Sequence, residues 1–216
     1  MIDAVVFDMD GVLIASEEIW DRVRESYVRE RGGRYDDDVQ RAMMGMSSPE
    51  WSRYLHHTAG LAESPETINA EVVELMLAAY RERLPLVAGA DEAVRRLAAR
   101  FPLAVASSSN RPLIDAVLDV SGLKECFQAT VSSEEVARGK PAPDVYLEAA
   151  RLLECPPERC AAVEDSHSGI RSARSAGMRV IAIPNPSYPP DADALAQADV
   201  VIRSLDELTP ELVASG

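Results

Sequence analysis

Two carboxylates near the N-terminus are the first residues whose types and spacing could do chemistry. The segment Val6–Val12 reads VFDMDGV, so that a hydrophobic run ends in Asp8 and Asp10. In a strand, residues two apart point to the same side. Two carboxylates this close repel each other, and holding both ionised requires a cation or a shared proton. The pair indicates a cation-binding site, although a solvated strand terminus explains this motif equally well when it is taken alone.

A second candidate is a run of hydroxyl side chains after another hydrophobic segment. Leu103–Asn110 reads LAVASSSN and is followed by Pro112, which is typical of the first turn of a helix. The free amides at a helix N-terminus bind phosphate well, and Ser107 adds a hydroxyl donor. Ser107 and the adjacent Ser108 are therefore the predicted phosphate-binding residues. Ser109 and Asn110 are more simply explained as the N-cap of the helix.

Lys140 lies between Gly139 and Pro141, just before a predicted helix. The Gly-Lys pair is not a phosphate-binding P-loop, because Pro141 replaces the Ser or Thr and Glu134 replaces the first glycine. A lysine fixed between glycine and proline is better explained as a cation aimed at an anion. An exposed loop lysine is the simpler alternative.

A second acidic pair, Glu164 and Asp165, follows the hydrophobic run Ala161–Val163 and precedes another predicted helix. Either acid could simply cap that helix. The pair would nevertheless lie at the same sheet edge as Asp8 and Asp10. Carboxylate oxygens gathered there suit Mg²⁺.

The elements that must position these side chains form a doubly wound α/β pattern. Short apolar runs predict buried parallel strands, and helical patterns separate them. The predicted strands are Ala4–Phe7, Leu103–Ala106, Gln128–Val131, Ala161–Val163, Arg179–Ile183 and Asp199–Ile202. The predicted helices between them are Asp91–Arg100, Arg111–Val120, Pro143–Leu153 and His167–Ala176. We expect a Rossmann-like core with a parallel sheet.

More than 90 residues without a strand pattern separate the first strand from the second. Helices are predicted there at Glu17–Arg31, Asp37–Met44, Pro49–His57 and Pro65–Arg83. We therefore expect an α-helical cap subdomain, residues 16–83, inserted into a core made of residues 1–15 and 84–216. The predicted hinges are Leu13–Ala15 and Leu84–Ala88, and Pro184–Pro190 is predicted to be a loop.

Composition limits the range of partners. The 216 residues carry a formal net charge of −14, which repels nucleic acid and anionic lipid, so neither is an expected partner. The three cysteines imply no disulfide framework, and no signal peptide or membrane-spanning run is evident. We expect a cytoplasmic protein that is a monomer or a small homo-oligomer.

The four motifs occur in a fixed order: D-x-D-G-V, a strand ending in Ser, G-K-P-x-P-D and E-D-S-x-x-G-I. In this order they resemble the haloacid dehalogenase superfamily of phosphotransferases, from residue 5 to about residue 183. The helical insertion falls where members with a helical cap carry theirs. The chain is most similar to the subgroup that holds β-phosphoglucomutase and many small-metabolite phosphatases.

The resemblance implies a role for each acid. Asp8 would be the nucleophile that forms an aspartyl-phosphate, and Asp10 would protonate the leaving oxygen and later deprotonate water. The Asp8 carboxylate, the Asp10 carbonyl oxygen and Asp165 would hold Mg²⁺, with Glu164 acting through a bound water. Ser107, Ser108 and Lys140 would bind the transferring phosphoryl group. The substrate would be a small-molecule phosphate ester, such as a sugar phosphate.

Two features of the sequence indicate which branch of the family this chain resembles. The dehalogenases lack the second aspartate, so Asp10 argues against carbon–halogen cleavage. Trp20 stands where β-phosphoglucomutase has a cap histidine, and no basic residue stands near Met46–Ser48, where its phosphate-binding arginine would fall. Without a fixed cation in the cap, hydrolysis is favoured over mutase activity. Arg53 could replace that cation only if its helix is turned differently, and core packing is the expected role of Trp20 and Trp51.

Two other classes are considered. A two-component receiver domain also phosphorylates an aspartate, but it predicts a chain near half this length without a helical insertion. A non-catalytic regulatory member of the fold would not need every catalytic position to be filled, as it is here. A phosphatase is the favoured prediction, with a phosphomutase or a regulatory protein as the alternatives.

Overall fold

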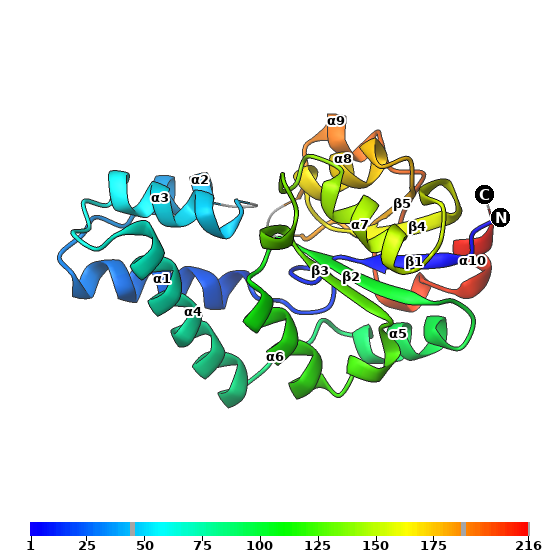
Figure 1. Ribbon diagram of the computed structural model, residues 1–216, viewed down its shortest axis with the longest axis horizontal. Helices are drawn as coiled ribbons and strands as arrows, with labels where there is room; N and C mark the ends of the chain where they lie inside the picture. Colours follow the sequence, from blue (N-terminus) through cyan, green and yellow to red (C-terminus); the bar gives the residue numbers. More distant parts are fainter. Residues whose placement is uncertain (44–45, 187–188, 216) are drawn as a thin grey trace.

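The sheet at the centre of the computed structural model is built from parallel strands (Figure 1). The structure describes residues 1–43, 46–186 and 189–215. Within these residues the strand order is β3-β2-β1-β4-β5-β6, and every neighbouring pair is parallel. The strands are β1 (Ala4–Phe7), β2 (Leu103–Ser107), β3 (Ala129–Ser132), β4 (Cys160–Glu164), β5 (Arg179–Ala182) and β6 (Val200–Val201). The predicted α/β fold class is confirmed, and the end strand is shorter than predicted.

Helices cover both faces of this sheet (Figure 1). One face packs against α5 (Ala90–Ala98) and α6 (Arg111–Ser121), and the other against α7 (Asp144–Leu152) and α8 (His167–Ser175). The chain ends with α9 (Ala192–Leu195) and α10 (Pro210–Ala214). Short 3₁₀ turns are found at Lys124–Cys126, Ser133–Glu135, Pro157–Arg159 and Leu205–Glu207.

The alternation of side chains along β1 explains the two layers. Val5 and Phe7 join the hydrophobic cluster under α5 and α6, whereas Ala4 and Val6 join the cluster under α7 and α8. All four residues are fully buried. Because both faces of a central strand are covered, its sequence is continuously apolar rather than alternating.

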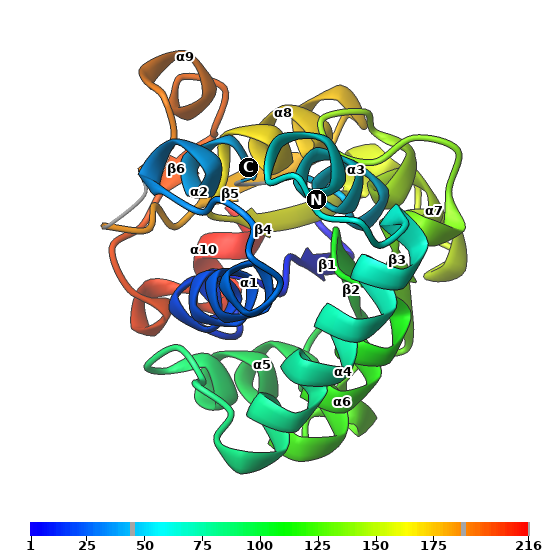
Figure 2. The ribbon, with the colours of Figure 1, turned by 90° about the vertical axis from the view of Figure 1, so that its left-hand side faces the viewer.

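Four helices lie between β1 and α5 in the described sequence: α1 (Glu17–Glu30), α2 (Asp37–Met43), α3 (Ser48–Thr58) and α4 (Pro65–Glu82). Figure 2 looks at the molecule from the side of these helices and shows them in front of the strands. Local sequence sets where two of them begin. Ser47 and Glu50 form a capping box at α3, and Ser64 accepts a hydrogen bond from the Thr67 amide at α4. We call this group of helices the cap.

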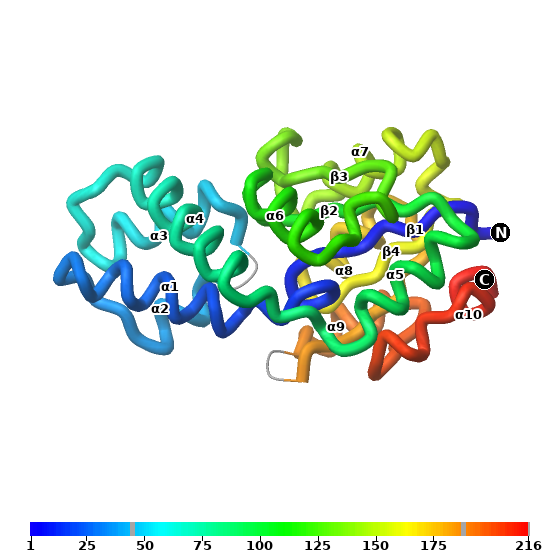
Figure 3. Tube along the Cα trace, turned by 90° about the horizontal axis from the view of Figure 1, so that it is seen from below, coloured from blue at the N-terminus to red at the C-terminus, as the bar shows by residue number. Residues whose placement is uncertain are grey.

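The two segments that join the cap to the core run side by side. The Ala15 amide donates to the Pro85 carbonyl at 2.8 Å, and the Val87 amide donates to the Leu13 carbonyl at 3.0 Å. Figure 3 shows the chain entering α1 and leaving α4 at neighbouring places. The exact division at residues 16 and 83 stays a prediction.

Three predicted features reach residues outside the described part of the chain. They are Met44 at the end of a predicted helix, Ser187 and Tyr188 in the predicted loop, and Gly216 at the end of the predicted core. Among the described residues, none of the helices combines the length and the apolar character that crossing a bilayer requires.

Candidate active site

A pocket lies where the strands of the sheet end, and the cap forms its opposite wall. The core contributes both acidic motifs, a serine-rich turn and a lysine. The cap contributes mainly aromatic, polar and sulfur-containing side chains. The core residues that line it are Asp8, Asp10, Ser108, Ser109, Lys140, Asp165, Ser166, His167 and Ser168. From the linker and the cap come Ser16, Glu17, Trp20, Asp21, Arg24, Tyr35, Gln40, Met43, Met46, Ser48 and Trp51.

Asp8 follows β1 directly and lies at the floor of the pocket. Its backbone amide donates to the Val163 carbonyl of β4 at 2.9 Å, so the sheet ladder continues through this residue. Its Oδ1 accepts a hydrogen bond from Lys140 Nζ at 2.8 Å. Burial raises the pKa of Asp8 to about 8, and the charge of Glu164 adds to this effect while Lys140 opposes it.

Lys140 is held by two carboxylates although it is only 7% exposed. Its Nζ donates to Asp8 Oδ1 at 2.8 Å and to Glu164 Oε1 at 2.6 Å. Burial by itself would lower the pKa of Lys140, but the charges and hydrogen bonds of these two carboxylates outweigh burial and raise it. Lys140 is therefore a fixed cation beside Asp8 and not an exposed loop lysine.

Glu164 is fully buried at the end of β4, and both of its carboxylate oxygens are occupied. Oε1 accepts from Lys140 and from the Tyr146 hydroxyl at 2.7 Å. Oε2 accepts from the Asp165 amide at 3.0 Å and from the amide and hydroxyl of Ser166, each at 3.1 Å. A Cβ on Gly169 of α8 would lie 1.7 Å from Glu164 Oε1, so only glycine leaves room for this carboxylate.

Asp8, Glu164 and Asp165 each offer a carboxylate oxygen, and these oxygens lie within 4.8 Å of one another. Burial raises the pKa of Asp165 well above its usual range, and the charges of Glu164 and Asp8 raise it further. Gly11 allows the close approach, since its φ is +82° and a Cβ there would lie 2.0 Å from Asp165 Oδ2. Buried carboxylates that repel one another fit a hard divalent cation, so this cluster could hold a metal.

Asp10 projects into the pocket with hydrogen-bond donors on both carboxylate oxygens. Oδ1 accepts from the Ser16 hydroxyl and from Trp20 Nε1, the latter at 3.4 Å. Oδ2 accepts from Ser109 Oγ at 2.7 Å and from Ser107 Oγ at 3.5 Å. The cap and the second strand thus orient the same carboxylate.

The serines at the end of β2 make contacts that differ from those expected from the sequence. Ser107 is fully buried and does not line the pocket, and its Oγ accepts from the Ser109 amide at 3.0 Å. Ser108 lines the pocket. Ser109, explained from sequence as a possible cap, instead contacts Asp10, while Asn110 is the N-cap of α6 without a side-chain capping bond. The phosphate-binding roles of Ser107, Ser108 and Lys140 stay predictions.

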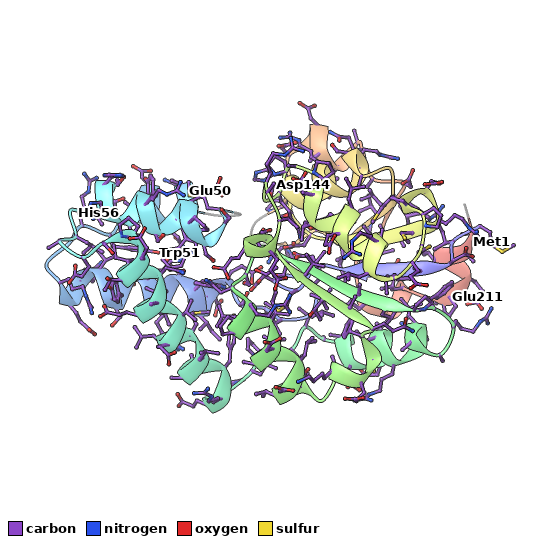
Figure 4. All side chains as sticks on the ribbon, viewed as in Figure 1. Met1, Glu50, Trp51, His56, Asp144 and Glu211 are labelled. Atoms are coloured by element: carbon purple, nitrogen blue, oxygen red, sulfur yellow. The ribbon has the colours of Figure 1, made fainter. Side chains whose placement is uncertain are left out.

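The expectation that the cap lacks a fixed cation is wrong. Arg24 of α1 lines the pocket, with its guanidinium carbon 4.3 Å from the centre of the Trp20 ring and 4.7 Å from that of Trp51. Figure 4 shows Trp51 on the side of α3 that faces α1. Trp20 and Trp51 therefore pack against each other and also line the pocket. Arg53 is exposed and does not line it.

The sequence carries a signal for Arg24 that lies outside the four catalytic motifs. In the predicted helix Glu17–Arg31, the apolar face runs through Trp20, Val23, Tyr27 and Val28, and Arg24 falls on that face. A basic residue in an apolar stripe is unusual and marks a candidate binding residue. The contacts of Ser16 and Ser109 with Asp10 had no comparable signal, because they depend on how separate segments meet.

Comparisons with known proteins agree with this geometry. The family model for haloacid dehalogenase-like hydrolases matches residues 2–177. The crystal structure of CbbY from Rhodobacter sphaeroides in complex with phosphate has a TM-score of 0.84 and is 31% identical, covering 96% of each chain. Hexitol phosphatase B of Escherichia coli (strain K12) is 33% identical over 95% of this chain and 94% of its own length.

The bifunctional riboflavin kinase/FMN phosphatase of Arabidopsis thaliana is 32% identical over 96% of this chain. This chain spans about half of that longer relative, 54% of its length. The match to the family model covers most of the sequence, and the motifs it includes meet in one pocket at the end of the sheet. The chain belongs to the haloacid dehalogenase-like hydrolases.

Proposed function

We propose that this protein is a Mg²⁺-dependent phosphatase that hydrolyses a small phosphorylated metabolite through an aspartyl-phosphate on Asp8. The observation that carries the proposal is the position of Asp8. It lies at the floor of a pocket, 2.8 Å from the buried cation Lys140 and within the carboxylate cluster that includes Asp165. This is the arrangement that nucleophilic attack on a phosphate ester requires.

Relatives support the same reaction class. Similar proteins are named as phosphatases of hexitol phosphates, of FMN and of phosphorylated carbohydrates. They share a small organic phosphate ester as substrate, and the acidic net charge of this chain also disfavours a phosphorylated nucleic acid.

In the first step, a carboxylate oxygen of Asp8 attacks the phosphorus of the ester. A new P–O bond forms to Asp8 as the bond to the leaving oxygen breaks, and that oxygen takes its electrons and a proton from Asp10. The Lys140 ammonium neutralises charge on the transferring phosphoryl group. The hydrogen bonds from Ser109 and Trp20 hold Asp10 in place for this transfer.

In the second step, Asp10 takes a proton from water, and the water oxygen attacks the phosphorus of the aspartyl-phosphate. The P–O bond to Asp8 breaks, and inorganic phosphate leaves. Asp8 and Asp165 would hold Mg²⁺, with Asp10 acting through its carbonyl oxygen. The expected action of Glu164 through a water stays a prediction, because both of its oxygens already accept hydrogen bonds from protein groups. The bound ion would neutralise the carboxylates and the phosphoryl oxygens.

The test combines variants, trapping and metal removal. Asp8→Asn should abolish phosphate release from a metabolite panel while the fold is kept, and Asp10→Asn should slow it by about 10²–10⁴-fold. Chelation should stop the wild type, and Mg²⁺ should restore activity where Ca²⁺ does not, because calcium accepts looser coordination. Rapid quenching with labelled ester should leave an acid-stable phosphoryl label in the wild type and none in Asp8→Asn. Substantial release by Asp8→Asn would rule out this mechanism.

A phosphomutase is the second candidate, and Arg24 is the observation that favours it. A cation in the cap could hold the distal group of a bisphosphate, and hydrolysis was favoured from the sequence because no such cation was expected. We propose hydrolysis because the relatives named above are phosphatases. Incubation with β-glucose 1-phosphate, Mg²⁺ and a trace of glucose 1,6-bisphosphate separates the two. Glucose 6-phosphate forming faster than inorganic phosphate would favour the mutase.

A further inference from the structure

Arg24 is a cation that the catalytic steps do not use. It projects from α1 into the pocket, and its guanidinium lies against the faces of Trp20 and Trp51. The two indoles come from different cap helices and contact each other edge to face, with ring centres 5.9 Å apart. Arg24 is therefore held at a defined place on the cap wall of the pocket.

Among the described residues, Lys140 is the other Lys or Arg side chain that lines the pocket, and Arg24 differs from it in its partners. Lys140 forms ion pairs with Asp8 and Glu164. Arg24 forms no ion pair or hydrogen bond with any residue that the structure describes, and its Nε is buried without a partner. A guanidinium carries five N–H donors and is the side chain best suited to carboxylate and phosphate.

The acidic groups near Arg24 do not form ion pairs or hydrogen bonds with it. Asp10 accepts its hydrogen bonds from Ser16, Trp20, Ser107 and Ser109, and Asp21 Oδ1 accepts from the Tyr35 hydroxyl at 2.8 Å. Burial lowers the pKa of Arg24 to about 10, and the charges of Asp10 and Asp21 oppose this effect, so Arg24 is still a cation at neutral pH. A half-buried cation whose Nε is shielded from water and has no counter-ion among the described residues has the electrostatics of an anion-binding group.

We propose that Arg24 binds a second anionic group of the substrate, a carboxylate or a second phosphate. The preferred substrates would then be phosphate esters that carry this second anion. The inference rests on the proposed function, because it assumes that the phosphoryl group to be cleaved lies at Asp8.

The two sites share one neighbour. Trp20 contacts both: its Nε1 is 3.4 Å from Asp10, and its ring centre is 4.3 Å from the Arg24 guanidinium carbon. The proposed acid at the reacting ester and the proposed anion site are therefore both in contact with a single indole. A substrate with a few bonds between its phosphate and its second anion would reach both.

The kinetic test compares esters that differ only in the second anion. The pairs are 6-phosphogluconate with glucitol 6-phosphate, phosphoglycolate with ethyl phosphate, and fructose 1,6-bisphosphate with fructose 6-phosphate. The first two pairs test a carboxylate and the third tests a phosphate. The wild type should prefer the doubly anionic member of at least one pair, and Arg24→Gln should reduce that preference by about 10–100-fold in kcat/KM. Arg24→Lys should retain part of it, because it keeps the charge but loses the planar fork.

Arg22→Gln is the matched control. Arg22 is an exposed residue of the same helix outside the pocket, and its substitution makes the same change in net charge. The preference should be unchanged in Arg22→Gln. A wild type without preference in any pair, or equal loss in Arg24→Gln for both members of every pair, would overturn the assignment.

A binding measurement separates failure of this assignment from failure of the proposed function. Calorimetry would compare the binding of 3-phosphonopropionate with that of propylphosphonate. Neither phosphonate can be hydrolysed, and only the first carries a carboxylate. Longer phosphonocarboxylates would be compared with their alkyl counterparts in the same way. The wild type should bind one of the carboxylates at least about 10-fold more tightly than its alkyl counterpart, and Arg24→Gln should not. If this difference holds but no ester is hydrolysed, the phosphatase proposal fails and the anion site stands. If esters are hydrolysed but neither rates nor binding depend on Arg24, the anion site fails and the phosphatase proposal stands.

Discussion

Glu164 shows how a buried carboxylate can serve this site through other residues. Its oxygens accept from Lys140, Tyr146, Asp165 and Ser166, and it has no exposed surface. These bonds place the Lys140 ammonium beside Asp8 and fix the start of the turn that carries Asp165. The Glu164 carboxylate fits only because Gly169, the residue of α8 that packs against it, has no side chain.

Gly169→Ala tests this packing. Alanine normally stabilises a helix relative to glycine. Here its Cβ would lie 1.7 Å from Glu164 Oε1, and Glu164 could move only by breaking its bonds to Lys140 and Tyr146. We expect a loss of about 1–3 kcal/mol in the free energy of unfolding, measured by urea denaturation, together with reduced phosphatase activity.

Ser175→Ala provides the control for Gly169→Ala. Ser175 is an exposed residue of the same helix, so its substitution raises helix propensity without entering the site. Its stability should be unchanged or slightly higher. If Gly169→Ala were as stable and as active as Ser175→Ala, the close packing of Glu164 under α8 would be wrong.

At the scale of the elements, the seam between cap and core is crossed by a polar network centred on Asn110. The Ser48 hydroxyl of α3 donates to Asn110 Oδ1 at 2.6 Å. Asn110 Nδ2 donates to Asn69 Oδ1 of α4 at 3.2 Å and to Glu134 Oε1 of the core at 2.7 Å. Asn110 is only 3% exposed and Ser48 is buried, so the bond between them is shielded from water. The N-cap of α6 thus ties two cap helices to the serine-rich turn that carries Ser109.

Asn110→Ala should loosen the cap from the core. It removes each of these bonds and leaves the buried Ser48 hydroxyl without its acceptor, which costs about 1–3 kcal/mol for a group that water cannot reach. We expect faster hydrogen exchange in the linker Leu84–Ala88 and in α4, and a higher KM. Asn69→Ala removes a single bond and should have a smaller effect in the same direction. Unchanged exchange in the linker, with exchange faster only in α6, would show that the network stabilises the helix and does not hold the cap.

For the whole molecule, the carboxylate cluster opposes folding in the absence of a cation. The pKa of Asp8 is about 8 in the fold and 3.8 in an isolated side chain. Between these two pH values the unfolded chain has lost a proton that the folded chain keeps. Stability contributed by this group therefore falls as pH rises through that window. A bound cation would remove this penalty, because it favours the charged form.

Thermal unfolding with Mg²⁺ and with chelator tests this linkage. The increase in Tm that Mg²⁺ produces should be larger at about pH 8 than at about pH 5, because metal binding must displace protons at the lower pH. One pKa unit corresponds to about 1.4 kcal/mol, so a shift of several degrees is expected. In Asp8→Asn the chelated protein should lose less stability over this range. A Mg²⁺ effect that is equal at both pH values would contradict the linkage.

Much of the fold could be read from the sequence because it depends on local patterns. The strands of the core and the helices of the cap were predicted to within a few residues, since continuous apolar runs and helical spacing are set by neighbouring positions. The gathering of Asp8 and Asp165 at one pocket followed from the rule that parallel strands end at the same edge. The place of Lys140 beside them followed from the family resemblance, because it lies in a loop before α7 and not at a strand end. The end strand, β6, was overestimated, because an edge strand is limited by its single partner as well as by its own sequence.

What the sequence by itself determined is the family of hydrolases to which this chain belongs, because the acidic and serine motifs keep their side chains within a few residues of a strand end. What only the tertiary structure decided is how that chemistry is directed. Arg24 became a candidate specificity residue only when Trp20 on α1 and Trp51 on α3 closed around it. Ser109 became a partner of Asp10 only when β1 and β2 were paired. These contacts join side chains far apart in the chain, and their geometry is set by how helices and strands pack, which spacing along a single segment does not record.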